Sequence, residues 1–266
     1  MYKVAVDPRN FRKDTIETER VILLDMVLSL AAVGSQALGE PIRSATVSLP
    51  AHNRVHHDGE FSVALMMRQA FDAADIEFVK ILLYTSQGEP LLFAENSVLA
   101  GHGLSICPNY TDNYWCGAVE DRKYEAYILI GYYANALEVT RTADTWTAYA
   151  PCSYPFPNHD LGADAKHHNP NEIFYWEAVH DHLIKTVTFS LRANITKVIF
   201  YGDHAGDARL RQEVRKVLDS RHQNPDYVES TLDPTFVGAL GAAEFVKRAP
   251  YARIPRGVVV QPKRDL

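Results

Sequence analysis

The chain has 266 residues, of which 47% are hydrophobic and 23% are charged, and its formal net charge is −6. This composition is typical of a globular protein with ample material for a core, and the length suits one large domain or two small ones. The negative charge excludes a protein that binds nucleic acid through a basic surface. The three cysteines have no regular spacing, which favours a reducing compartment, so we expect a cytoplasmic protein.

The first strong signal along the chain is a helix. Asp14 and Glu17 have the spacing of a capping box and predict a helix that runs to about Leu38. Its segment 21–38 is long enough to cross a membrane, but the charge of Asp25 near its start favours a buried core helix. We therefore expect no membrane partner.

The remaining segments alternate between strands and helices, which indicates an α/β fold. Three consecutive strands between 124 and 151 predict an antiparallel meander. We expect a partial first lobe (1–105), a linker (106–123) and a second lobe (124–266). The predicted strands lie at 44–49, 78–84, 127–130, 137–140, 145–151 and 197–201, and the predicted helices at about 60–74, 89–100, 172–191, 207–219 and 233–248.

The segment 127–140 organises this pattern. An apolar strand (127–130) leads into a turn (131–136), and a second strand (137–140) carries the acidic residue Glu138. This arrangement resembles the second phosphate loop of the actin-like ATPases, most closely the DnaK-type heat-shock chaperones. Their pattern is an apolar strand, Asp-Leu-Gly-Gly-Gly-Thr, and a strand with an acid.

The chemistry of that loop has been replaced in this chain. A phosphate cradle needs glycines because the backbone N–H groups must approach the ligand closely. Here Gly131 stands in place of the family's Asp, and only the acid, as Glu138, is retained. The three glycines and the Thr correspond to Tyr133, Ala134, Asn135 and Ala136. The resemblance therefore implies a retained frame without ATPase activity and without a nucleotide cofactor.

Weaker likenesses to the same family follow in the correct order along the chain. They imply an actin-like ATPase (ribonuclease H-like) fold with two lobes and a groove, in which the first phosphate-loop strands and the upper subdomains are missing. The segments that carry them are 38–51, Glu89-Pro90, Asp160-Leu161-Gly162, 198–203 and 238–243.

The groove implied by this resemblance suggests a set of candidate residues that could hold and polarise an apolar molecule. We expect no metal, because the histidines lack the spacing of a zinc site. The alternative is that the tyrosines plug a dead nucleotide site. The catalytic candidates are Tyr132, Tyr133, His52 and His204, and the substrate-binding candidates are Asn135, Glu89, Asp160, Asp203 and Asn53.

Three functions follow from these candidates. The first is a cofactor-independent cyclase or isomerase for an apolar small molecule, in its specific form a Diels–Alderase that fixes one substrate conformation. The second is a non-catalytic, chaperone-like interaction protein, for which a homodimer is expected because missing lobes leave apolar faces to cover. The third is a weak adenosine-nucleotide binder that uses Gly202 and the segment 238–243.

Overall fold

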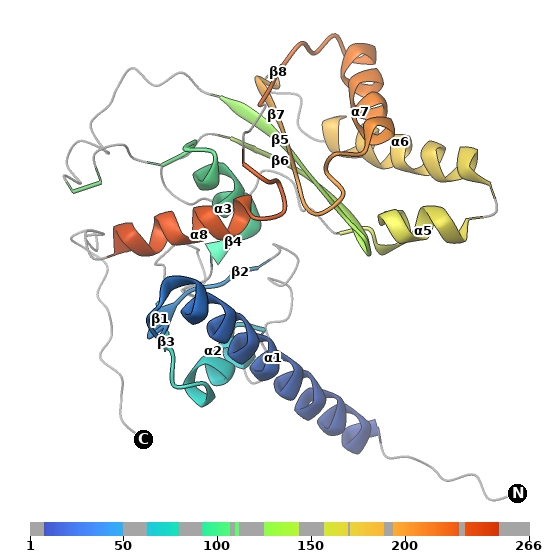
Figure 1. The fold of residues 1–266 in the computed structure, drawn as a ribbon. Coiled ribbons are helices and arrows are strands. Elements are labelled where there is room, and N and C mark those ends of the chain that lie inside the picture. Colours follow the sequence, from blue (N-terminus) through green and yellow to red (C-terminus); the bar gives the residue numbers. More distant parts are fainter. Residues whose placement is uncertain are drawn as a thin grey trace, which may run out of the picture.

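The computed structural model describes residues 8–49, 63–79, 92–106, 110–111, 125–143, 157–169, 171–188, 194–228 and 232–249. These residues form a mixed α/β structure, which confirms the predicted class (Figure 1). The helices are α1 (Pro8–Leu38), α2 (Val63–Ala73), α3 (Ala94–Gly101), the 3-10 helix η2 (His159–Leu161), α5 (Ala163–His168), α6 (Glu172–Thr188), α7 (Ala208–Ser220) and α8 (Val237–Arg248). The strands are β1 (Ser44–Ala45), β2 (Ser48–Leu49), β3 (Glu77–Phe78), β4 (Leu92–Phe93), β5 (Ala126–Tyr133), β6 (Ala136–Ala143), β7 (Lys197–Tyr201) and β8 (Asp226–Tyr227).

The main sheet has four strands in the order β6-β5-β7-β8. Strands β5 and β6 form an antiparallel hairpin, whereas β7 runs parallel to β5 and β8 runs parallel to β7. The hairpin turn is shorter than predicted, because Tyr132 pairs with Leu137 and Tyr133 pairs with Ala136. The third strand of the predicted meander (145–151) lies outside the described residues.

Each face of this sheet packs against a different pair of helices (Figure 1). Residues at alternate positions of a strand point to opposite faces, so the even-numbered and odd-numbered residues of β5 separate. Ile128, Ile130 and Tyr132 join the core that contains α6 and α7. Tyr127 and Leu129 join a second cluster that contains residues of α3 and α8.

Helices α3 and α8 lie unusually close together because their contact is made by glycine. A Cβ atom on Gly241 of α8 would lie 1.7 Å from the Ser97 carbonyl oxygen of α3. No side chain fits that space, so the small-residue segment of α8 is explained by this contact. The contact holds α8 beside the sheet.

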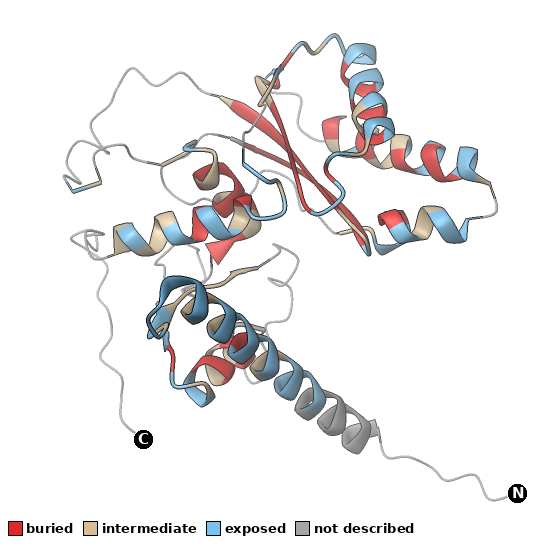
Figure 2. Cartoon of the chain, viewed as in Figure 1, coloured by how far each residue is buried: buried red, intermediate tan, exposed pale blue. Residues whose placement is uncertain are grey.

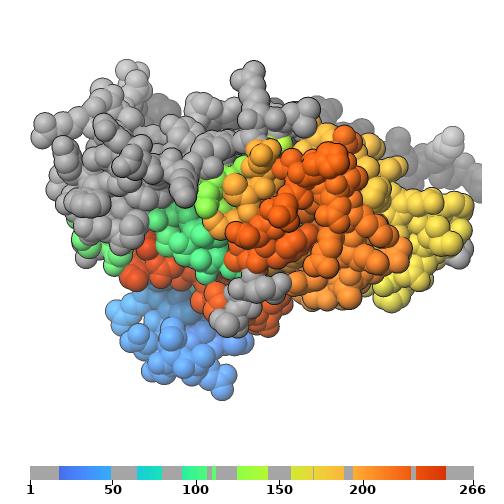
Figure 3. All heavy atoms as spheres, turned by 90° about the horizontal axis from the view of Figure 1, so that it is seen from above, coloured from blue at the N-terminus to red at the C-terminus, as the bar shows by residue number. Residues whose placement is uncertain are grey.

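Helix α1 differs from its prediction, because it is not a buried core helix. Its stretch Thr18–Leu38 has 21 residues and is long and apolar enough to cross a membrane, yet only 6% of an apolar 18-residue window within it is buried. One side contributes Val27 to a cluster with α2, but α2 and the two-residue strands are too small to cover the other side. Residues 18–38 of α1 are mostly coloured as exposed in Figure 2, and the blue atoms of the described N-terminal segments lie at one edge of the molecule in Figure 3. Within residues 18–38 of α1, the large apolar residues that are exposed are Val21, Ile22, Met26, Leu28, Leu30, Val33 and Leu38.

Several short elements also differ from the predictions. The helix expected from residue 89 begins at Ala94, because Leu92 and Phe93 form β4 and pair with β2. The predicted loop 152–170 contains η2 and α5, and the predicted loop 221–232 contains β8. These elements are too short for a periodic sequence signal, and the two strands among them, β4 and β8, pair with strands that are distant in sequence.

Candidate functional site

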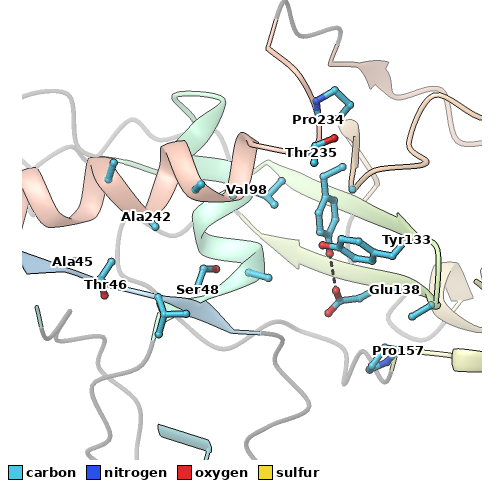
Figure 4. A pocket seen from close by; sticks show the side chains of 18 of the residues that line it. Ala45, Thr46, Ser48, Val98, Tyr133, Glu138, Pro157, Pro234, Thr235 and Ala242 are labelled. Atoms are coloured by element: carbon cyan, nitrogen blue, oxygen red, sulfur yellow. Dashed lines mark hydrogen bonds between the residues drawn. The ribbon is translucent and has the colours of Figure 1, made fainter. Parts of the chain in front are cut away.

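A cavity of about 770 Å³ lies between the end of the β5–β6 hairpin, helices α3 and α8, and the segment 44–48 (Figure 4). Its walls are mostly apolar, with a few hydroxyl groups. The apolar part is supplied by Ala94, Val98, Ala239, Ala242, Ala243 and Val246, and the hydroxyl groups by Ser44, Thr46, Ser48 and Thr235. Small-molecule sites typically have this size and character.

A row of three residues across neighbouring strands forms one end of the cavity. Gly131 of β5 pairs with Glu138 of β6 on one side and with Tyr201 of β7 on the other. The Tyr201 hydroxyl reaches across Gly131 and donates a 3.1 Å hydrogen bond to Glu138 Oε2 (Figure 4). A Cβ atom on residue 131 would lie 2.7 Å from Tyr201 Cζ, so only glycine leaves room for this bond.

Glu138 is the one carboxylic acid among the described residues of this site. It is 2% exposed and lines the cavity, and its Oε1 atom has no hydrogen-bond partner among the described residues. Burial raises the pKa of the Glu138 carboxyl to about 7, although the hydrogen bond from Tyr201 opposes that shift. Near neutral pH the carboxyl can therefore both accept and donate a proton.

Tyr133 adds a second ring beside this carboxyl. Its ring meets that of Tyr201 edge-on, with the centroids 6.0 Å apart. Burial raises the pKa of the Tyr133 hydroxyl, and the nearby charges of Glu138, Asp203 and Glu95 raise it further. Tyr133 therefore stays neutral, and the carboxylates give this end of the cavity a negative potential.

Of the residues predicted to face the groove, Tyr133 and Asn135 line the cavity. The prediction for Tyr132 is wrong, because this residue belongs to strand β5 and not to the turn. As the neighbour of Tyr133 in a strand, Tyr132 points to the opposite face, where it is fully buried and its hydroxyl lies 2.8 Å from that of Tyr175.

The other predicted site residues are not brought together. The exposed residues Asp160, Asp203 and His204 are not part of the cavity wall. The His204 ring instead meets the edge of Tyr132, with the centroids 6.0 Å apart. The predicted candidates His52, Asn53 and Glu89 lie outside the described residues.

Sequence reasoning missed two residues that define the site. Glu138 was identified only as the acid retained from the family pattern, and Tyr201 only as the end of a strand. A signal was present for both: a carboxyl within the predicted strand 137–140, and a tyrosine at the last position of a buried strand. Strand pairing, which no local pattern gives, joins the two residues.

A second buried carboxylate offers a contrast. Glu213 of α7 is 4% exposed and borders a surface cavity between α6 and α7. Its oxygens lie 3.0 Å from Arg209 Nε, 2.8 Å from Lys216 Nζ and 3.4 Å from His180 Nδ1. Buried charges are normally paired in this way, whereas Glu138 Oε1 has no partner in the part of the chain that the structure describes. Within the described ranges, no group of three or more His, Cys, Asp or Glu residues could hold a metal ion.

Comparison with known proteins finds neither a protein family that matches the chain nor a curated protein similar to it. The geometry of the cavity is therefore the basis for a function.

Proposed function

We propose that the chain binds an apolar small molecule in the cavity and promotes its cyclisation or isomerisation. The observation that carries the proposal is the buried Glu138 carboxyl, which has one oxygen without a partner among the described residues and lies in the wall of a mostly apolar cavity of about 770 Å³. An unpaired buried charge is unfavourable, so such a carboxyl lowers the stability of the fold unless a ligand binds to it.

The proposed frame is a cut-down actin-like ATPase with two lobes. The β5–β6 hairpin with its strand-borne acid, the parallel strand β7 and the glycine-containing helix α8 support it. The division at 106–123 stays a prediction, because Ala242 of α8 belongs to the same cluster as residues of α1 and α2. In this frame the cavity occupies the region of the family's groove.

The cavity can accelerate a reaction in two ways. Its walls can hold a flexible substrate in one folded conformation, which is sufficient for a pericyclic ring closure of the Diels–Alder type. The Glu138 carboxyl and the Tyr133 hydroxyl can also hydrogen-bond to a substrate carbonyl or move a proton. Neither mode needs a nucleotide.

The same geometry disfavours binding of adenosine nucleotides, the weakest of the three functions. Among the described residues that line the cavity there is no Lys or Arg, and the charged residue at its end is an acid. A phosphate group would be repelled there.

The test is product formation from a polyene that carries a diene and a dienophile. We expect the wild-type chain to accelerate ring closure and Ala239→Trp, which fills the cavity from the exposed side of α8, to abolish the acceleration. Leu240→Trp is the matched control, because Leu240 lies on the same helix, is 44% exposed and does not line the cavity. Equal rates for both variants would contradict the proposal.

The exposed surface of α1 favours a second candidate function, an interaction protein that forms a homodimer. Leu30 and Val33 are 69% and 66% exposed, although both are apolar. Surfaces of this kind mark sites of association. Light scattering tests this function: a dimer that becomes monomeric in Leu30→Ser/Val33→Ser supports it, and a monomeric wild-type chain contradicts it.

A further inference from the structure

The cavity has an unbalanced charge. Glu138 is the one carboxylic acid among the described residues of its wall, and neither Lys nor Arg accompanies it there. The charges of Glu95 and Asp203 act on the neighbouring Tyr133 from α3 and from the turn after β7. The other titratable groups at this end are the hydroxyl of Tyr201 and the exposed ring of His159. The electrostatic potential at this end is therefore negative.

The free oxygen of Glu138 is positioned to bind a donor. The hydroxyl of Tyr201 uses its one proton to donate a hydrogen bond to Oε2, and this bond fixes the orientation of the carboxyl. Oε1 is buried without a partner among the described residues, and the side chain points into the cavity (Figure 4). A carboxylate can accept several hydrogen bonds, and those from charged donors are the strongest.

Two aromatic residues lie at the same end of the cavity as this carboxyl. Tyr133 and Tyr201 both line the cavity wall, and their rings stand nearly perpendicular, at 85°. Tyrosine rings attract cations, and the attraction is strongest where water is excluded. A carboxylate with flanking tyrosines at the end of an apolar cavity is thus suited to an amine that carries a hydrophobic body.

We propose that the cavity selects apolar molecules that carry a protonated amine, with the ammonium group on Glu138 Oε1 and the hydrophobic body against the small residues of α3 and α8. This inference rests on the proposed function and names its substrate class. Anions are excluded by the same carboxylate.

Three rigid probes of nearly equal size test the inference by calorimetric titration: adamantyl amine, adamantanol and adamantane carboxylate. At about pH 8 we expect the amine to bind at least about tenfold more tightly than the alcohol, since it forms a charge-assisted hydrogen bond, and the carboxylate not to bind. Below the Glu138 pKa of about 7, the amine should lose affinity because the carboxyl becomes protonated.

Two variants test whether the preference for the amine depends on Glu138. Glu138→Gln should remove the preference for the amine while adamantanol still binds. The matched control is Glu177→Gln, which removes the same charge from the exposed surface of α6 and should change neither affinity. Circular dichroism confirms that both variants are folded.

The outcomes separate the two proposals. Equal affinity for amine and alcohol in the wild-type chain, or a preference that persists in Glu138→Gln, overturns the inference and leaves the proposed function standing. Failure of all three probes to bind overturns both.

Discussion

The two faces of the main sheet are built from the same strands but have different roles. On the face toward α6, the polar groups of the buried tyrosines are paired: the Tyr175 hydroxyl donates to the Leu161 carbonyl at 2.9 Å and lies 2.8 Å from the Tyr132 hydroxyl. On the face toward α3 and α8, no described residue is a hydrogen-bond partner of Glu138 Oε1. The first face is a complete core, and the second has a ligand-sized gap.

This difference separates stability from function within one sheet. Apolar burial on the first face stabilises the fold, and this free energy offsets the unfavourable burial of the Glu138 carboxyl on the second face. Substitutions on the two faces should therefore change the free energy of unfolding in opposite directions. Truncating a core residue of the first face should lower it, whereas replacing the carboxyl of the second face should raise it.

The largest expected effect is in the complete core. Leu183 of α6 is 1% exposed, and Leu183→Ala should lower the free energy of unfolding by about 2–5 kcal/mol, because it leaves a cavity. Urea denaturation measures the change. Ile173→Ala on the same helix is the control, since Ile173 is 67% exposed and should have little effect. A similar loss in both variants would argue that this face is not a packed core.

The opposite sign is expected for Glu138→Gln. Burial raises the pKa of this carboxyl from 4.5 to about 7, which corresponds to roughly 3 kcal/mol of lost stability once the group is ionised. For a raised carboxyl pKa the native state binds more protons, so wild-type stability falls as pH rises from about 4.5 to 7. The variant should thus be more stable than wild type at pH 8, and the difference should shrink toward pH 4.5.

Chemical unfolding at several pH values measures this difference. A Glu138→Gln variant that is less stable than wild type at pH 8 would mean that the carboxylate has a compensating partner.

Gly131→Ala should have an intermediate effect on the second face. Its new methyl group would meet the Tyr201 ring, so we expect about 1–3 kcal/mol of destabilisation from overcrowding and loss of the bond to Glu138. A double-mutant cycle checks the cause: in a Tyr201→Ala background the same change should cost much less. Additive effects would show that the two residues do not interact.

The smallest effect is expected for Tyr132→Phe. The lost hydroxyl has its hydrogen bond in the complete core, so the free energy of unfolding should fall by about 1 kcal/mol. Binding of adamantyl amine should not change, because Tyr132 lies on the other face. The paired variant Tyr133→Phe tests the cavity side. A loss of amine binding in Tyr132→Phe alone would contradict the assignment of faces.

The elements with strong periodicity could be predicted from the sequence. Strand β7 has the predicted bounds, and α6 and α7 differ by a few residues at their ends, because long apolar runs and helical spacing are local signals. The parallel pairs of β1 with β3 and of β2 with β4 could not be predicted, since they join two-residue strands that are distant in sequence.

The site could be predicted only in part. A glycine-to-tyrosine replacement in the hairpin led to Tyr133 and Asn135, but the turn was expected to be longer than it is. That length decided which face Tyr132 occupies, because a shift of one residue between turn and strand reverses the direction of the side chain. The bond between Tyr201 and Glu138 depends on strand pairing across Gly131, which no local pattern contains.

Gly131 has a consequence for how the chain tolerates mutation. It has no side chain to offer a ligand, yet every replacement at this position would displace the Tyr201 ring. In a saturation library selected for ligand binding, position 131 should rank among the least permissive, beside Glu138. The absence of a side chain at position 131 would thus be conserved under selection as strictly as a reactive group.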